Sequence, residues 1–178
     1  MKTKYTHCTL LNGCIDMEPQ PGMTVTVENG RITGIDPCGQ DEKGGRFIDL
    51  NGRYLMPGLI NLHVHLPGGG EPKKKEQDNT KMAKLVMSNP LTRQIGRKIC
   101  ENYAKTELLS GVTTIRTVGG LGDLDAKIRD RILSGKADGP RMLVSNMAVS
   151  VTGGHMAGSV AYAAESAGLL KENPTGLN

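Results

Sequence analysis

Residues 58–178 alternate between stretches with a strand pattern and stretches with a helix pattern, which limits the possible fold more than any other feature. Strands are expected at residues 59–66, 112–117 and 141–148, and the main helices at residues 90–110 and 124–134. This alternation predicts βα units whose parallel strands share one sheet. Three such units fit, whereas a closed eight-unit barrel takes about 250 residues. We therefore expect an α/β fold containing a partial (β/α) TIM-type barrel, made of its first three βα units.

The first 57 residues follow a different pattern, in which short strands are joined by tight turns. Met23–Val27 alternates apolar and polar residues, as a strand of a half-buried sheet does. Asn29-Gly30 and Asn51-Gly52 are strong turn signals because both residue types tolerate positive φ. We predict the N-terminal part of a small β-sandwich domain in residues 1–57, and the start of the barrel in residues 58–178.

Residues 59–66, with the sequence LINLHVHL, are expected to form the first barrel strand. Successive side chains of a strand point to opposite faces, so His63 and His65 share one face with Leu59 and Asn61. The opposite face is wholly apolar and should meet a layer of helices; it consists of Ile60, Leu62, Val64 and Leu66. Polar residues near the C-terminal end of the first face are typical of a barrel strand that contributes to an active site.

The pair formed by His63 and His65 is the strongest chemical signal in the chain. Residues two apart are separated by about 6.6 Å along a strand, and both side chains lie on one face. Two imidazoles so placed can converge on one ion, at about 2.0–2.1 Å from each nitrogen. Neutral imidazole suits Zn, Fe, Mn and Ni. The alternative is a pair of strand histidines that form hydrogen bonds only, and the position of the pair after an apolar strand favours the metal site.

Three segments resemble motifs of a known superfamily. Residues 54–65, YLMPGLINLHVH, closely resemble the opening signature of the amidohydrolase superfamily, whose small β-sandwich the preceding hairpin pattern also resembles. Residues 111–116, GVTTIR, and residues 139–141, GPR, followed by TGGH at 152–155, are similar to motifs of the imidazolonepropionase-like and Xaa-Pro-dipeptidase-like branch. The resemblance covers the N-terminal part of such a protein.

The resemblance implies a metal-dependent hydrolase in which a metal-activated water attacks a C–N bond of a non-peptide amide, a cyclic amide or a dipeptide. It implies that His63 and His65 are ligands of a divalent metal, with Zn the metal we expect, and that a complete enzyme holds one or two ions. Complete members add a carboxylated lysine, two further histidines and an aspartate from later strands, and none of these is assigned here. The catalytic residues, including the general base, stay unknown. Thr117 stands where the pattern often has Asp.

Other polar residues carry weaker signals. His155 lies in a Gly-rich stretch, VTGGHMAG, that we expect at the C-terminal end of a strand, where it would contact substrate. The alternative is a loop histidine bonded to backbone. Arg116 lies inside an expected strand, and a structural ion pair is the favoured role. Lys73–Lys75 is expected in a solvated loop rather than in a lid.

Composition excludes several classes of function. The net charge is +4, and the chain has no Trp and one Phe, so neither a basic stripe nor an aromatic platform for nucleic acid is present. No apolar run approaches the roughly 20 residues of a membrane helix. The four cysteines form no C-x-x-C pair, and we expect reduced thiols in a cytoplasmic protein.

Two hypotheses on function stay open. The first is an enzyme that hydrolyses C–N bonds of a small-molecule substrate and is present here as an N-terminal fragment. The second is a catalytically inactive fragment or binding subunit that needs a partner chain. We expect either a homo-oligomer or a second chain that carries the missing half of the barrel. A downstream region supplying a lysine, two histidines and an aspartate would favour the first hypothesis.

Overall fold

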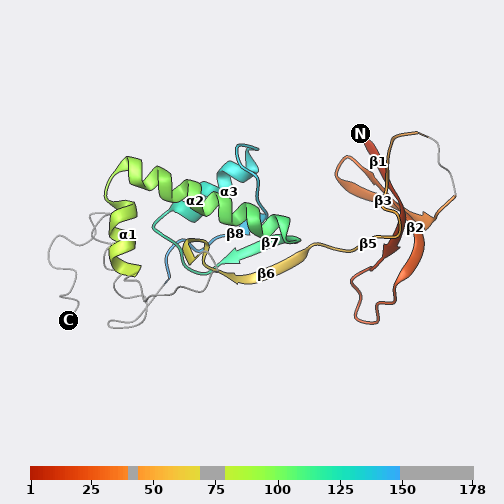
Figure 1. Cartoon of the computed structure of the whole chain (residues 1–178), viewed down its shortest axis with the longest axis horizontal. Coiled ribbons are helices and arrows are strands. Elements are labelled where there is room, and N and C mark those ends of the chain that lie inside the picture. Colours follow the sequence, from red (N-terminus) through yellow and green to blue (C-terminus); the bar gives the residue numbers. More distant parts are fainter. Residues whose placement is uncertain (40–43, 69–78, 149–178) are drawn as a thin grey trace. The chain divides into compact units, whose positions relative to one another are not determined.

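The computed structural model describes residues 1–39, 44–68 and 79–148 (Figure 1). The chain divides into two compact units, Met1–Pro57 and Gly58–Asn178, which are treated separately below. No helix in the described residues is long and apolar enough to cross a membrane.

The first unit is built on one five-stranded sheet. Its strands are β1 (Lys2–Leu10), β2 (Gln20–Glu28), β3 (Arg31–Pro37), β4 (Arg46–Asp49) and β5 (Tyr54–Leu55). The order is β3-β2-β1-β4, and β5 also pairs with β1. The pairs β1–β2 and β2–β3 are antiparallel, whereas β4 and β5 run parallel to β1. Both predicted Asn-Gly turns form, with Asn29 and Asn51 at φ of 51° and 47°. The second sheet that a sandwich requires is not among the described residues of this unit.

In residues 58–68 and 79–148, the second unit contains three parallel strands and three α-helices. The strands β6 (Leu59–Val64), β7 (Val112–Thr117) and β8 (Arg141–Leu143) form a sheet in that order. The short 3-10 helix η1 (Leu66–Gly68) and the helices α1 (Asn79–Met87) and α2 (Pro90–Leu109) connect β6 to β7, and α3 (Leu124–Leu133) connects β7 to β8. A mixed α/β fold with parallel strands is thus confirmed, and the strand-to-helix order predicted for these units is present.

The ends of α2 form as the sequence indicates. The Asn89 side chain accepts hydrogen bonds from the backbone N–H groups of Leu91 and Thr92, at 3.0 Å each. Pro90 occupies the first turn, where a missing N–H costs nothing. At the other end the chain leaves the helix through Gly111 at φ 95°, a conformation that glycine adopts without strain.

One apolar core joins the sheet to α2 and α3. The strands contribute Val64, Ile115 and Met142, and the helices contribute small and branched side chains, among them Cys100, Ala104 and Ile128. Because these residues form one cluster, both helices cover the same face of the sheet, as Figure 1 shows. His63 lies on the opposite face of β6, which α2 and α3 do not cover.

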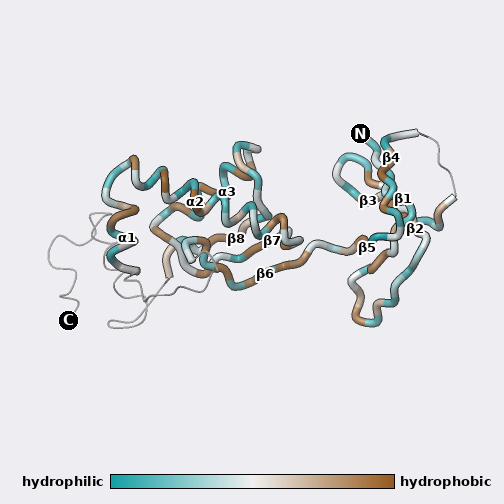
Figure 2. The backbone as a smooth tube through the Cα atoms, in the orientation of Figure 1, coloured by the Kyte–Doolittle hydropathy of each residue, from teal (hydrophilic) through white to brown (hydrophobic). Residues whose placement is uncertain are grey.

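The predicted packing of β6 is correct at only one end of the strand. Val64 and Leu66 are buried, whereas Ile60 and Leu62 keep 64% and 54% of their surface exposed. The described helices therefore cover only the C-terminal part of the apolar face. Hydrophobic stretches along β6 are visible in Figure 2.

The largest apolar side chains of α2 do not face the core. Leu91, Ile95 and Ile99 are 68%, 53% and 46% exposed. The buried positions include Gly96, Cys100 and Ala104, four residues apart, on the neighbouring face. Small side chains let the helix lie close to its neighbours: a Cβ on Gly96 would collide with the side chain of Val86 in α1.

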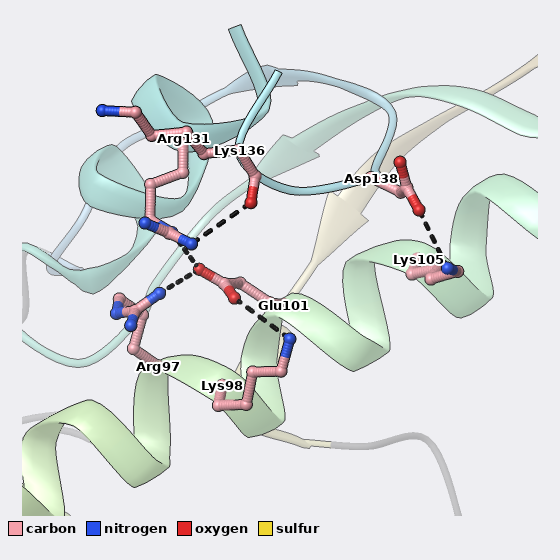
Figure 3. A network of polar contacts seen from close by, with 7 residues as sticks. All are labelled: Arg97, Lys98, Glu101, Lys105, Arg131, Lys136 and Asp138. Carbon is pink, nitrogen blue, oxygen red and sulfur yellow. Dashed lines mark hydrogen bonds and ion pairs between the residues drawn. The ribbon is translucent and has the colours of Figure 1, made fainter. Parts of the chain in front are cut away.

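A buried ion-pair network ties α2 to α3 (Figure 3). Glu101 is 3% exposed, and its Oε1 accepts from Arg97 and, at 2.6 Å, from Nε of Arg131. Lys98 lies 3.8 Å from Oε2. Arg131 also donates to the backbone oxygen of Lys136 at 3.2 Å. One carboxylate therefore joins two helices and the turn that follows α3.

The third strand of the sheet is shorter than predicted. A strand was expected over residues 141–148, but β8 ends at Leu143. Asn146 takes φ 60°, which breaks an extended strand. Its backbone oxygen accepts from the N–H of Gly120, and its Oδ1 accepts from the N–H of Ala126 at 3.1 Å. The segment after β8 is thus shaped by contacts with the loop after β7.

Candidate metal centre at the ends of the strands

His63 and His65 converge at the C-terminal end of β6. Their Nε2 atoms lie 3.2 Å apart, and the rings meet edge to face with centroids 5.1 Å apart. His63 is the last residue but one of β6, and His65 is the first residue after the strand. The prediction that the two side chains share a face is confirmed.

The carbonyl oxygen of Gly119 orients the His65 ring. It lies 2.9 Å from Nδ1 of His65, so Nδ1 carries the proton and donates it. With that tautomer, Nε2 of His65 accepts from the Nε2–H of His63, because only one proton can lie between the two nitrogens. Nδ1–H bonded to a backbone carbonyl is the arrangement that leaves Nε2 available to a metal.

The spacing of the two Nε2 atoms fits a divalent metal. Two nitrogens bound at about 2.0–2.1 Å in tetrahedral geometry lie about 3.3–3.4 Å apart. The observed 3.2 Å is close to that separation. Neutral His63 has one ring proton, so binding a metal through Nε2 would require that proton to lie on Nδ1 in place of Nε2.

In the part of the chain that the structure describes, no further metal ligand lies next to the pair. Within residues 1–39, 44–68 and 79–148, His, Cys, Asp and Glu side chains form no group of three or more that could hold a metal ion. His155, expected to contact substrate, lies outside the described residues, as does Lys73–Lys75. Two protein nitrogens leave the remaining positions of a metal to water or to other ligands.

Among the described residues, Arg116 forms a backbone contact in place of the expected ion pair. Its Nε donates to the carbonyl oxygen of Leu62 at 2.8 Å, and its side chain is exposed. The contact links β7 to β6 one residue before His63. Arg116 therefore supports the strand pairing that carries the candidate ligand.

Asp125 is a buried acidic residue that sequence reasoning did not identify. Its side chain is fully buried at the start of α3, and neither oxygen has a hydrogen-bond partner of regular geometry among the described residues. Burial raises the pKa of the Asp125 carboxyl, and the Thr117 hydroxyl and a protonated His65 oppose that rise. A signal was present: Asp125, Ile128 and Ile132 follow helical spacing, so an acidic residue stands in an apolar stripe.

Glycines allow the loop after β7 to approach both Asp125 and His65. A Cβ on Gly120 would lie 2.5–2.6 Å from the carboxylate atoms of Asp125. A Cβ on Gly119 would lie 3.3 Å from two atoms of the His65 ring. The backbone of this loop thus lies between the His65 ring and the buried carboxylate of Asp125.

Comparison with known proteins identifies the family. Residues 54–176 match the family described as the amidohydrolase family, which is more than half of the chain. The imidazolonepropionase of Klebsiella pneumoniae (strain 342) is 54% identical over 44 residues, which are 25% of this chain and 11% of that protein. The allantoinase of Enterococcus faecalis is 42% identical over 62 residues, 33% of this chain and 13% of that protein.

The fold is also similar to that of a solved dipeptidase. A solved Xaa-Pro dipeptidase, with methionine bound in its active site, superposes with a TM-score of 0.68 and 27% identity. The match covers 87% of this chain and 36% of the dipeptidase chain, so the chain spans about a third of the length of that structure.

The parallel sheet, the histidine pair at its end and these matches define one class: the chain belongs to the amidohydrolase family. The resemblance to the amidohydrolase superfamily expected from the sequence is confirmed. The relatives named here are hydrolases that act on C–N bonds.

Proposed function

We propose that this chain carries the first two metal ligands of a hydrolase that acts on C–N bonds of a small-molecule substrate. One observation carries the proposal: the two Nε2 atoms of His63 and His65 lie 3.2 Å apart, with His65 oriented by the Gly119 carbonyl. A divalent cation supplies polarisation of a substrate carbonyl and activation of water when it is bound there. Zn is the cation we propose, because imidazole nitrogen in a tetrahedral site suits it.

The residues of this chain hold and orient the site. His63 and His65 would bind through Nε2, and the Gly119 carbonyl would keep the His65 proton on Nδ1. The Arg116 contact to Leu62 holds β7 against β6 just before the pair. His155 is proposed to contact the substrate, whose class by family likeness is a dipeptide, a cyclic amide or another non-peptide amide.

The missing ligands and the general base are proposed to come from barrel strands other than β6, β7 and β8. The sheet of the second unit has β6 and β8 as its edges, and apolar side chains of β6 and α2 are exposed. Such edges and faces fit further βα units, whether from the same polypeptide or from a partner chain. Without those units the chain would bind metal but would not catalyse hydrolysis, as the second hypothesis states. Four free cysteines agree with a reducing compartment, and we propose the cytoplasm.

Metal analysis and hydrolysis assays test the proposal together. The protein is purified in the assembly in which it is produced, dialysed against Zn²⁺ and measured for bound metal. Hydrolysis is then assayed with panels of dipeptides and cyclic amides, before and after chelation. We expect bound Zn²⁺ and chelator-sensitive hydrolysis in the complete assembly. An assembly without bound Zn²⁺, or with hydrolysis that survives complete metal removal, would contradict the proposal.

A further inference from the structure

The carboxylate of Asp125 is buried in a way that calls for a reason. It is fully buried, and among the described residues no hydrogen bond of regular geometry reaches either oxygen. Burying a polar group without a partner costs free energy, on the order of 1–3 kcal/mol from mutational data. A group kept at such a cost is a candidate for a functional role.

The surroundings of Asp125 connect it to the loop after β7. The carboxylate lies against Gly120, whose missing side chain leaves the room for it. Cys100 and Thr117 are buried near it: burial and then the charge of Asp125 raise the pKa of Cys100, and the Thr117 hydroxyl lowers the pKa of Asp125. His65, when protonated, is near enough to lower the pKa of Asp125.

The same loop is held from its other side by Asn146. The Asn146 backbone oxygen accepts from Gly120, and its side chain accepts from the N–H of Ala126, the residue after Asp125. The Gly119–Gly120 loop therefore lies between Asp125 and Asn146. Its Gly119 carbonyl is the acceptor of the His65 Nδ1–H.

We propose that Asp125 is a positioning residue for the metal ligand His65, acting through the Gly119–Gly120 loop. The carboxylate fixes where the Gly119 carbonyl lies, by contact with Gly120. When the carboxyl is ionised, its charge acts on the ring from the side of that loop and favours the proton on Nδ1. Nε2 is thereby left free for a metal. The inference rests on the proposed metal site, but the orientation of the imidazole can be tested in protein without metal.

The test compares two substitutions of Asp to Asn that lie two residues apart. Asp125→Asn keeps the shape of the side chain and removes its charge. Asp123→Asn is the control, because Asp123 lies at the same end of α3 but is half-exposed and pairs with Arg93 and Lys127 at 2.7 and 2.8 Å. Asp125→Ala is added to remove the contact with Gly120 as well. All variants are studied as the full chain, in the assembly in which it purifies.

Two measurements report on His65. In metal-free protein labelled with ¹⁵N-histidine, the nitrogen shifts show which ring nitrogen is protonated. Titration with Co²⁺, followed by its visible absorption, gives the affinity of the histidine pair. We expect Asp125→Asn to move the His65 proton partly from Nδ1 to Nε2 and to weaken Co²⁺ binding about 10-fold. Asp125→Ala should weaken it by up to about 100-fold, as loss of groups behind metal ligands does. Asp123→Asn should leave both readouts unchanged.

The possible outcomes separate the two proposals. If wild-type protein binds Co²⁺ and Asp125→Asn alters neither the tautomer nor the affinity, the positioning role is refuted and the metal site stands. If wild-type protein binds no Co²⁺, the metal site is refuted, and the tautomer measurement alone decides the role of Asp125. Should Asp125→Ala not fold, Asp125→Asn still gives the answer, since it preserves the volume of the side chain.

Discussion

The Nδ1 atom of His65 lies 2.9 Å from the carbonyl oxygen of Gly119, so a side chain at the end of β6 is fixed by the backbone after β7. The two residues are 54 positions apart in the chain. This contact leaves Nε2 of His65 free. The geometry of the candidate metal centre therefore depends on the loop after β7, which α3 and Asn146 hold in place.

The first prediction concerns the two ligands. His63→Ala and His65→Ala should each weaken Co²⁺ or Zn²⁺ binding by at least about 10-fold, because one imidazole remains from a pair that shares one ion. Competition with a chromophoric chelator measures the affinity. His7→Ala is the matched control: His7 lies in a strand of the first unit, 3.1 Å from Asp49. Unchanged affinity in both site variants would show that the pair forms hydrogen bonds only.

The second prediction concerns the glycine between the loop and Asp125. Gly120→Ala should lower the free energy of unfolding by about 1–3 kcal/mol, because the added Cβ would lie 2.5–2.6 Å from a buried carboxylate. Gly68→Ala, the control, adds a Cβ whose nearest neighbour among the described residues is the Cβ of His65 at 4.0 Å, an ordinary contact. Denaturant melts of both variants give the comparison. Equal stability of the two would mean that the loop moves freely away from Asp125.

The third prediction concerns the network around Glu101. Glu101→Gln should destabilise the second unit by about 2–4 kcal/mol, because it leaves the partly buried Arg97 and Arg131 facing each other without a counter-charge. Asp138→Asn, which breaks the exposed pair with Lys105, should leave the unfolding temperature almost unchanged, because solvent screens such a pair. Thermal unfolding, monitored by circular dichroism, distinguishes the two. A loss for Glu101→Gln no larger than that for Asp138→Asn would refute a structural role for the network.

Local signals predicted much of the fold because they act over a few residues. The Asn-Gly turns, the Asn89 cap and the glycine after α2 depend on φ preferences and on hydrogen bonds within one turn. The orientation of α2 was not predictable in that way. Its apolar stripe and its small-residue face both repeat every four residues, and only packing against α1 and the sheet decides between them.

The same difference between local signals and long-range contacts applies to the candidate site. Residues two apart on one strand must share a face, so the convergence of His63 and His65 followed from spacing alone. The Gly119 carbonyl and Asn146 act on the site across long stretches of sequence, and backbone acceptors leave no residue-type signal. Asp125 did leave one, as an acidic residue in an apolar helical stripe, but the stripe does not show what the residue faces.

The fourth prediction concerns thiol chemistry. Burial, together with the charges of Asp125 and Glu101, raises the pKa of the Cys100 thiol to about 12. At pH 8 the folded protein should therefore leave Cys100 unalkylated by iodoacetamide, while the exposed Cys14 is modified within minutes. Peptide mass spectrometry after a timed reaction shows the difference. The folded state holds the Cys100 proton more tightly than the unfolded state, so the contribution of Cys100 to stability falls as the pH rises above about 9. Rapid alkylation of Cys100 under native conditions would contradict its burial.

The last prediction concerns the apolar surfaces of the second unit. Ile95 and Ile99 on α2, and Ile60 and Leu62 on β6, expose about half of their surface or more. In water such surfaces favour association, and β6 adds an open strand edge. We therefore expect residues 1–178, expressed alone, to self-associate and to show no turnover with dipeptides, because two histidines give neither a complete coordination sphere nor a general base.

Sedimentation velocity at several concentrations tests this expectation, with hydrolysis measured on the same samples. Ile95→Gln combined with Ile99→Gln should shift the chain toward smaller species, because it removes apolar area from α2 and leaves the core residues Cys100 and Ala104 untouched. Lys98→Gln, on the same helix and largely exposed, is the control and should not reduce association. A well-folded wild-type monomer with metal-dependent turnover would contradict the prediction, since three parallel strands would then complete the site without further βα units.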